Sequence, residues 1–157
     1  MRFVFFICLI LAITGCSVKE KIVVSKAYYI LIKTPRIKIA DTGFLTQSET
    51  STKLQIFNAT TPLLNLHVTQ SQICLEATCM QKSRFYEEFF AGVHYDDFLD
   101  DILHLAPLYD GKNLVQLADG FEQKIVLEKS DIYYKIENKN LIFKDIKNDI
   151  LILFKEL

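Results

Sequence analysis

The fold is decided by residues 113–154, which read NLVQLADGFEQKIVLEKSDIYYKIENKNLIFKDIKNDILILF. Short runs rich in β-branched and aromatic residues alternate with turn-forming pairs, which is typical of antiparallel strands. Asp119-Gly120 is the strongest hairpin signal, and Asn138-Lys139-Asn140 and Lys147-Asn148 mark two further turns. We expect five strands here, over 113–117, 121–128, 131–137, 141–145 and 149–154.

The same pattern fills the chain between residues 22 and 81. Tyr28–Ile32 is a dense β-favouring run that Pro35 ends. Apolar residues alternate with polar ones through residues 37–40, 54–58 and 64–69, as in half-buried strands. Turns are expected at Asp41-Thr42-Gly43 and in the polar stretch 47–52.

The period changes in the middle of the chain. Residues 83–90 place three phenylalanines on one helical face, and Gly92 is expected to end that helix. Residues 95–105 give the clearest helix, which Pro107 stops, with four aspartates on its polar side. With no internal repeat or linker, residues 23–157 form a single domain. Its predicted class is mainly β (α+β), a curved antiparallel sheet or incomplete barrel of about 10–11 strands around one or two short helices.

The N-terminus reads MRFVFFICLILAITGC, residues 1–16. Arg2 supplies a positive charge before the apolar run from Phe3 to Ile13. That run is too short to cross a hydrocarbon layer of about 30 Å, which takes roughly 20 helical residues. It fits the apolar region of a signal peptide. The alternative is an uncleaved membrane anchor that contains a chance cysteine.

Ile13-Thr14-Gly15-Cys16 resembles the bacterial lipobox. The resemblance implies that the Cys16 sulfur receives diacylglycerol, that residues 1–15 are removed, and that residues 16–22 form a lipidated tether. The protein would then be attached to a membrane of the bacterial cell envelope through Cys16. Ser17, where an aspartate would favour the inner membrane, implies the outer membrane, with the domain facing the periplasm.

Cys74 and Cys79 remain in the domain, and an envelope compartment allows disulfides to persist. If residues 73–75 and 79–81 pair as a hairpin, the two cysteines lie opposite each other at bonding distance. We expect a structural disulfide. Two free thiols and a redox or metal pair are the alternatives, although a C-x4-C spacing is not the C-x2-C of those classes.

Composition and motifs exclude several functions. The formal net charge is −1, whereas nucleic-acid binding needs a basic excess. No serine elbow or glycine-rich phosphate loop is present, and five glycines are too few for such a loop besides turns, so no catalytic residue and no cofactor are expected. His94, Asp97, Asp101 and His104 could in geometry hold a metal, but a solvated acidic helix face is the favoured interpretation, so no metal is expected.

The apolar residues of the helical segment admit two interpretations. They fill an ordinary core, or some of them line a cavity for a lipid or acyl chain, which a curved sheet plugged by a helix readily encloses. The candidate lining residues are Phe85, Phe89, Phe90, Phe98, Leu99, Ile102 and Leu103.

The order of these elements resembles the LolA/LolB superfamily of periplasmic lipoprotein carriers and receptors. Many short strands follow a lipobox, a helical segment interrupts them, Ala106-Pro107-Leu108 leads back to strands, and a terminal hairpin over 141–154 closes the chain. The resemblance implies an incomplete barrel that wraps helices and shelters acyl chains.

We therefore expect a lipid-anchored envelope protein that binds acyl chains of lipoproteins or lipids, for example in lipoprotein localisation to the outer membrane. The alternative is a structural or assembly lipoprotein with a solid core and a protein partner. An apolar pocket of several hundred Å³ would favour the first function, and a filled core the second.

Overall fold

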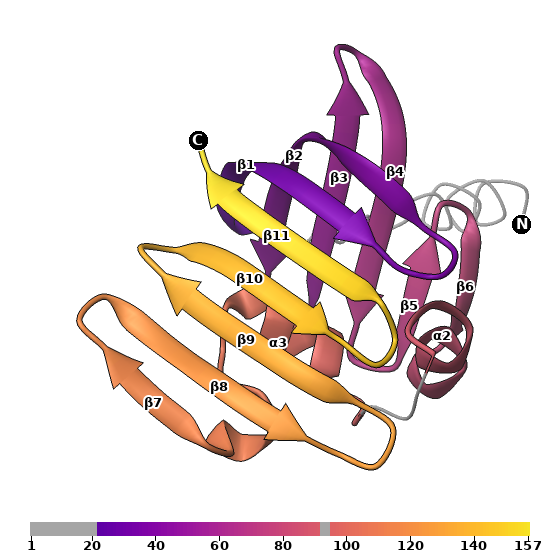
Figure 1. Ribbon diagram of the computed structural model, residues 1–157. Coiled ribbons are helices and arrows are strands. Elements are labelled where there is room, and N and C mark those ends of the chain that lie inside the picture. The colour runs from indigo at the N-terminus through magenta and orange to yellow at the C-terminus, as the bar shows by residue number, and fades with distance from the viewer. Residues whose placement is uncertain (1–21, 92–94) are drawn as a thin grey trace, which may run out of the picture.

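The computed structural model describes residues 22–91 and 95–157, and within them eleven strands form one antiparallel sheet (Figure 1). The strand order is β6-β5-β4-β3-β2-β1-β11-β10-β9-β8-β7. The elements, in chain order, are β1 (Ile22–Lys33), β2 (Lys38–Ser48), β3 (Ser51–Asn58), β4 (Thr61–Thr69), β5 (Gln72–Leu75), β6 (Thr78–Gln81), α2 (Lys82–Phe89), α3 (Phe98–His104), the 3-10 turn η1 (Tyr109–Gly111), β7 (Leu114–Leu117), β8 (Gly120–Val126), β9 (Asp131–Glu137), β10 (Asn140–Asp145) and β11 (Ile150–Glu156).

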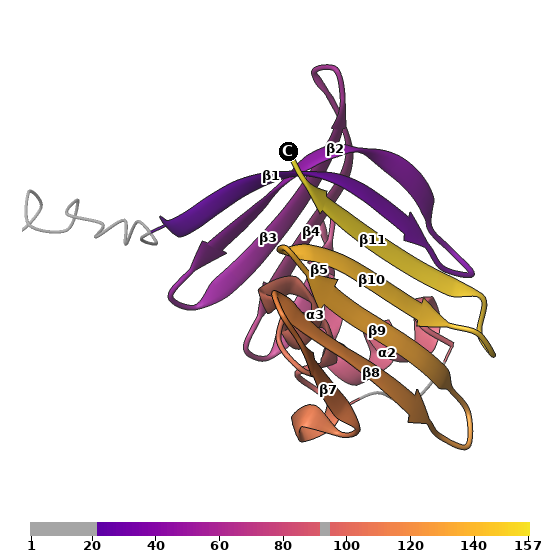
Figure 2. The same cartoon turned by 60° about the vertical axis from the view of Figure 1, so that its left-hand side comes forward.

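The first and last strands meet at the centre of the sheet. β1 pairs with β2 on one side and with β11 on the other, so Ile30 lies opposite both Asp41 and Phe154. Each remaining strand pairs with its neighbour in sequence. The sheet curves, and both helices lie on its concave side between the β3–β5 wing and the β8–β10 wing (Figure 2). The predicted fold class is confirmed.

The core is formed by side chains that alternate between buried and less buried positions along the strands. In β9 and β11 every second residue is buried, because successive side chains point to opposite faces of a sheet. The inward residues of the strands and of both helices join in a single hydrophobic cluster. The concave face is therefore apolar over most of its area.

Two predicted turns are wrong in detail. Asp41-Thr42-Gly43 lies inside β2, where Gly43 pairs with Tyr28 and with Ile56. A side chain at Gly43 would collide with the Gln55 carbonyl and the Ile30 side chain, so this glycine permits close approach of two strands instead of a turn. The polar stretch 47–52 is also mostly strand, since β2 runs to Ser48 and β3 begins at Ser51.

The second helix is shorter than the predicted 95–105. α3 begins at Phe98, and Leu105 adopts a left-handed backbone (φ 55°) that ends it two residues before Pro107. Asp96 and Asp97 therefore precede the helix instead of forming its first turn. Gly92 and His94 lie outside the described residues. In the part of the chain that the structure describes, no helix has both the length and the apolarity to cross a bilayer.

Candidate functional site

Phe98, the first residue of α3, lies at the centre of the interior. Its side chain is fully buried. Its ring centroid is 5.8 Å from those of Tyr86 and Phe90 and 5.5 Å from that of Phe143 on β10, all in edge-to-face geometry. Such pairs add to the hydrophobic gain from burial. Both helices are thus attached to the sheet by interlocking aromatic rings.

A small apolar cavity lies between the helices and strands β1, β3, β4 and β11. Its volume is about 20 Å³, room for roughly one water molecule. Its lining is hydrophobic apart from Thr34. The interior in this conformation is therefore filled, and an acyl chain does not fit unless a helix moves.

The structure divides the seven predicted lining residues. Phe89 and Phe98 are buried but do not line the cavity. Five of the predicted residues do line it, namely Phe85, Phe90, Leu99, Ile102 and Leu103.

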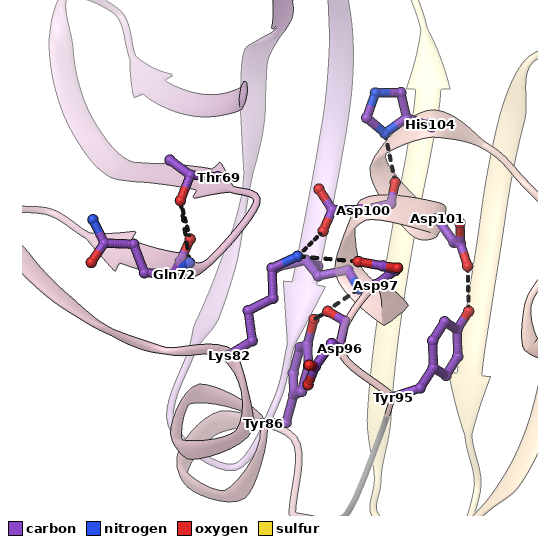
Figure 3. A network of polar contacts seen from close by, with 11 residues as sticks. Thr69, Gln72, Lys82, Tyr86, Tyr95, Asp96, Asp97, Asp100, Asp101 and His104 are labelled. Atoms are coloured by element: carbon purple, nitrogen blue, oxygen red, sulfur yellow. Dashed lines mark hydrogen bonds and ion pairs between the residues drawn. The ribbon is translucent and has the colours of Figure 1, made fainter. Parts of the chain in front are cut away.

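A larger, polar cleft lies on the other side of α3. It is open to solvent and has a volume of about 620 Å³. The β2–β3 and β4–β5 turns form one wall, and α3 with its preceding residue Asp97 forms another. Figure 3 shows Thr69 from the first wall and Lys82, Asp97, Asp100 and His104 around the cleft. The lining consists mainly of hydroxyl and charged groups: Ser48, Glu49, Thr50, Ser51, Thr52, Thr69, Gln70, Ser71, Lys82, Asp97, Asp100 and His104.

α3 therefore separates two unlike spaces. Leu99, Ile102 and Leu103 face the apolar cavity, whereas Asp100 and His104 face the cleft. This division follows from the 3.6-residue period of a helix whose apolar residues lie three and four apart. The sequence predicted both faces of the helix, but not that the polar face borders a cleft.

Lys82 joins the two helices from within the cleft (Figure 3). Its side chain is only 5% exposed, and its Nζ lies 2.6 Å from Asp100 Oδ2 and 3.3 Å from Asp97 Oδ1. Burial lowers the pKa of the ammonium, but the hydrogen bonds and negative charges of Asp100 and Asp97 outweigh burial and raise that pKa above its ordinary value. Lys82 is thus held in its charged form by carboxylates that belong to α3 and its N-terminal boundary.

Two tyrosines add polar contacts around α3. The Tyr86 hydroxyl donates to the Asp96 carbonyl at 2.8 Å and accepts from the Leu99 amide at 3.2 Å, so it satisfies one of the free amides at the helix start. The Tyr95 hydroxyl donates to Asp101 at 2.5 Å. Burial is the largest influence on the Asp101 carboxyl and raises its pKa. The hydrogen bond from Tyr95 lowers that pKa but is outweighed, and the negative charges of Asp97 and Asp100 raise it further.

One further polar contact connects α3 to the sheet. Gln47 at the end of β2 donates from Nε2 to the carbonyl of Leu103 at 3.2 Å. Sequence reasoning did not identify Gln47, Lys82 or Tyr86, because their partners lie 10 to 56 residues away in the chain. The sequence offers only an aspartate-rich segment, residues 96–101, as a signal that a positive partner is needed.

The predicted disulfide is present. Cys74 on β5 and Cys79 on β6 lie directly opposite each other and are bonded. The bond closes the hairpin at the edge of the sheet, and β6 continues directly into α2 at Lys82. Cys16, the predicted lipidation site, lies outside the described residues.

The acidic residues considered for a metal have other contacts. His104 Nδ1 lies 2.8 Å from the Asp100 carbonyl, and Asp97 and Asp101 contact Lys82 and Tyr95. Within residues 22–91 and 95–157, no group of three or more histidine, cysteine, aspartate or glutamate side chains is placed to hold a metal ion.

No protein-family model matches the chain, and no curated protein matches it either.

Proposed function

We propose that this is a lipid-anchored envelope protein that shelters acyl chains of lipoproteins or lipids between its curved sheet and α3. One observation carries the proposal: a concave, apolar sheet face is covered by two helices of only 8 and 7 residues. Short helices gain little stability of their own, so their position depends on packing that another apolar group can replace.

The free energy lost when α3 leaves the interior is similar to the free energy gained when an acyl chain is buried there. Moving α3 uncovers Phe98, Leu99, Ile102 and Leu103, each worth about 1.5–3 kcal/mol when buried, or about 6–12 kcal/mol together. An acyl chain of roughly fifteen methylenes gains about 12 kcal/mol on burial, at about 0.8 kcal/mol for each methylene. A passive exchange between helix and ligand, without an energy source, is therefore feasible.

The place where the tether joins the domain supports this function. β1 begins six residues after Cys16, and its first residue pairs with Ser48, which lines the polar cleft. Six residues span at most about 20 Å. A lipid on Cys16 would therefore hold the cleft, and α3 beside it, close to the membrane that delivers or receives the acyl chain.

The direct test uses the chain from Ser17 onward, which retains every described strand and helix. We expect co-purified lipid in mass spectrometry and saturable binding of a fluorescent fatty acid. Leu99→Gln, which places an amide against the apolar cavity, should weaken that binding, while Phe44→Ala on the outer face should leave it unchanged. Absence of both bound lipid and fatty-acid binding would exclude the proposal.

A second function is favoured by the small volume of the cavity. Because the cavity holds only about 20 Å³, the interior resembles an ordinary packed core. A packed core fits a structural or assembly lipoprotein that acts through a protein partner. Recovery of an anchored, tagged copy from cells separates the two functions. A protein partner in constant ratio with no bound lipid supports the second, and bound lipid supports the first.

A further inference from the structure

Opening the interior would change the surroundings of Lys82. The two carboxylates that compensate its ammonium, Asp97 and Asp100, lie at the start of α3 and within it. Lys82 itself is the first residue of α2, directly after β6 and the disulfide hairpin. If α3 moves away from the sheet, the carboxylates leave with it and Lys82 stays behind.

A buried ammonium without a partner is costly. In the closed conformation the Lys82 side chain is only 5% exposed, and the loss of both carboxylates removes charge-assisted hydrogen bonds that another anion can replace. The other charged groups that line the cleft are Glu49 on the β2–β3 turn and His104 on α3. An open state would therefore be stabilised by an anion that takes the place of Asp97 and Asp100.

The position of Lys82 specifies what that anion is attached to. Lys82 lines the polar cleft, and Phe85, three residues later on the same helix face, lines the apolar cavity. The ammonium thus stands at the boundary between a space of about 620 Å³ for polar groups and the interior that α3 fills. A molecule with an acyl chain and an anionic head would satisfy both sides at once.

We propose that Lys82 binds the anionic head of the acyl ligand, a carboxylate or a phosphate, and that Asp97 and Asp100 occupy this position while α3 is closed. The proposal rests on the acyl-binding function above and names its ligand class. The exchange is one of ion-pair partners, and no covalent bond changes.

The test compares three probes on the chain from Ser17 onward: palmitate, palmitoyl lysophosphatidic acid and uncharged monopalmitoylglycerol. The unaltered chain should prefer one or both anionic probes over monopalmitoylglycerol by at least about tenfold, since hydrogen bonds to charged groups are the strong ones. Palmitate and the lysophosphatidic acid distinguish a carboxylate from a phosphate as the preferred head.

Variants on both sides of the ion pair give opposite expectations. Lys82→Gln should abolish the anionic preference, Lys82→Arg should keep it, and Asp100→Asn should increase it by removing the internal competitor. Lys144→Gln, on the exposed side of β10, is the matched control and should change nothing.

The outcomes are separable. If none of the three probes binds, the acyl-binding function itself fails. The second outcome is that all three probes bind equally and that Lys82→Gln and Asp100→Asn raise the binding of every probe by the same factor. In that case Lys82 only holds α3 closed, so the headgroup proposal is overturned and the acyl-binding function stands. If Lys82→Gln does not fold, the unaltered chain's preference and the Asp100→Asn shift still decide the question.

Discussion

The two sides of α3 differ in polarity, in access to solvent and in the volume of the space that each borders. One side packs Leu99, Ile102 and Leu103 against an apolar cavity of about 20 Å³, and the other borders an open polar cleft of about 620 Å³ that contains a buried ion pair. Packing on the first side contributes most of the stability, because dispersion and hydrophobic burial add over many contacts. The ion pair on the second side contributes little stability but determines which charges move when the helix moves.

The largest expected effect tests the interior side. Phe98→Ala removes the central ring and should lower the free energy of unfolding by about 3–5 kcal/mol, measured by urea denaturation. The matched control is Phe44→Ala, because Phe44 is 49% exposed on the outer face. It should cost less than about 1 kcal/mol. Equal costs would show that α3 does not share the core.

The next effect concerns the support beneath α2. Replacing both Cys74 and Cys79 by alanine opens a loop of only a few residues, so the entropic loss is small, about 2 kcal/mol. Faster amide exchange should be confined to β5, β6 and α2. Equally fast exchange in β9 and β10 would contradict the view that this hairpin stabilises one edge of the sheet alone.

The cleft side should respond less than the interior. Lys82→Met removes the buried ammonium and leaves Asp100 without its partner; because the Asp100 side chain is 26% exposed, we expect about 1–2 kcal/mol in thermal unfolding, below the cost for a fully buried pair. Lys33→Met is the matched control, because Lys33 also lies 2.6 Å from a carboxylate, that of Asp149, but both side chains are exposed. An exposed pair should cost roughly 0–1 kcal/mol. A larger loss at Lys33 would refute the role of burial.

The smallest effect is a pH dependence at Asp101. Its pKa is raised in the folded state, so folding favours the protonated form; that contribution is present at low pH and is lost as the pH rises through the folded-state pKa. Asp101→Asn keeps an acceptor for Tyr95 and removes the charge, so it should raise stability at pH 7 by less than about 1 kcal/mol.

The gain from Asp101→Asn should shrink as the pH approaches about 4, near the ordinary carboxyl pKa. Glu87→Gln, on the exposed face of α2, should show no such trend. Unfolding measured at pH 4 and pH 7 checks both variants, and a destabilising Asp101→Asn at pH 7 would contradict the expectation.

The sequence predicted the strands well because alternation and turn chemistry are local. β9 matches its expected bounds of 131–137, and a hairpin joins β7 to β8 where Asp119-Gly120 predicted one, although its two turn residues are Ala118-Asp119 and Gly120 begins β8. The prediction failed at Gly43, where the same residue type that favours turns instead allows close strand approach. Only the pairing partners distinguish the two uses, and they lie far away in the chain.

The site was predicted only in part, for a related reason. Helical period alone indicated which side of α3 is apolar, and five of seven expected residues line the cavity. The volume of that cavity depends on how the rings of Phe90, Phe98 and Phe143 pack between the helices and β10, which no local pattern encodes. The Lys82 contacts likewise depend on how α2 and α3 dock, since Lys82 and Asp100 are 18 residues apart.

The movement of α3 is tested most directly by a distance measurement. Spin labels at His104 on α3 and at Lys53 on β3, both exposed positions, report the separation of helix and sheet by double electron–electron resonance. With palmitate bound, we predict a longer and broader distance distribution than in the free chain. Saturating palmitate with an unchanged distribution would contradict it.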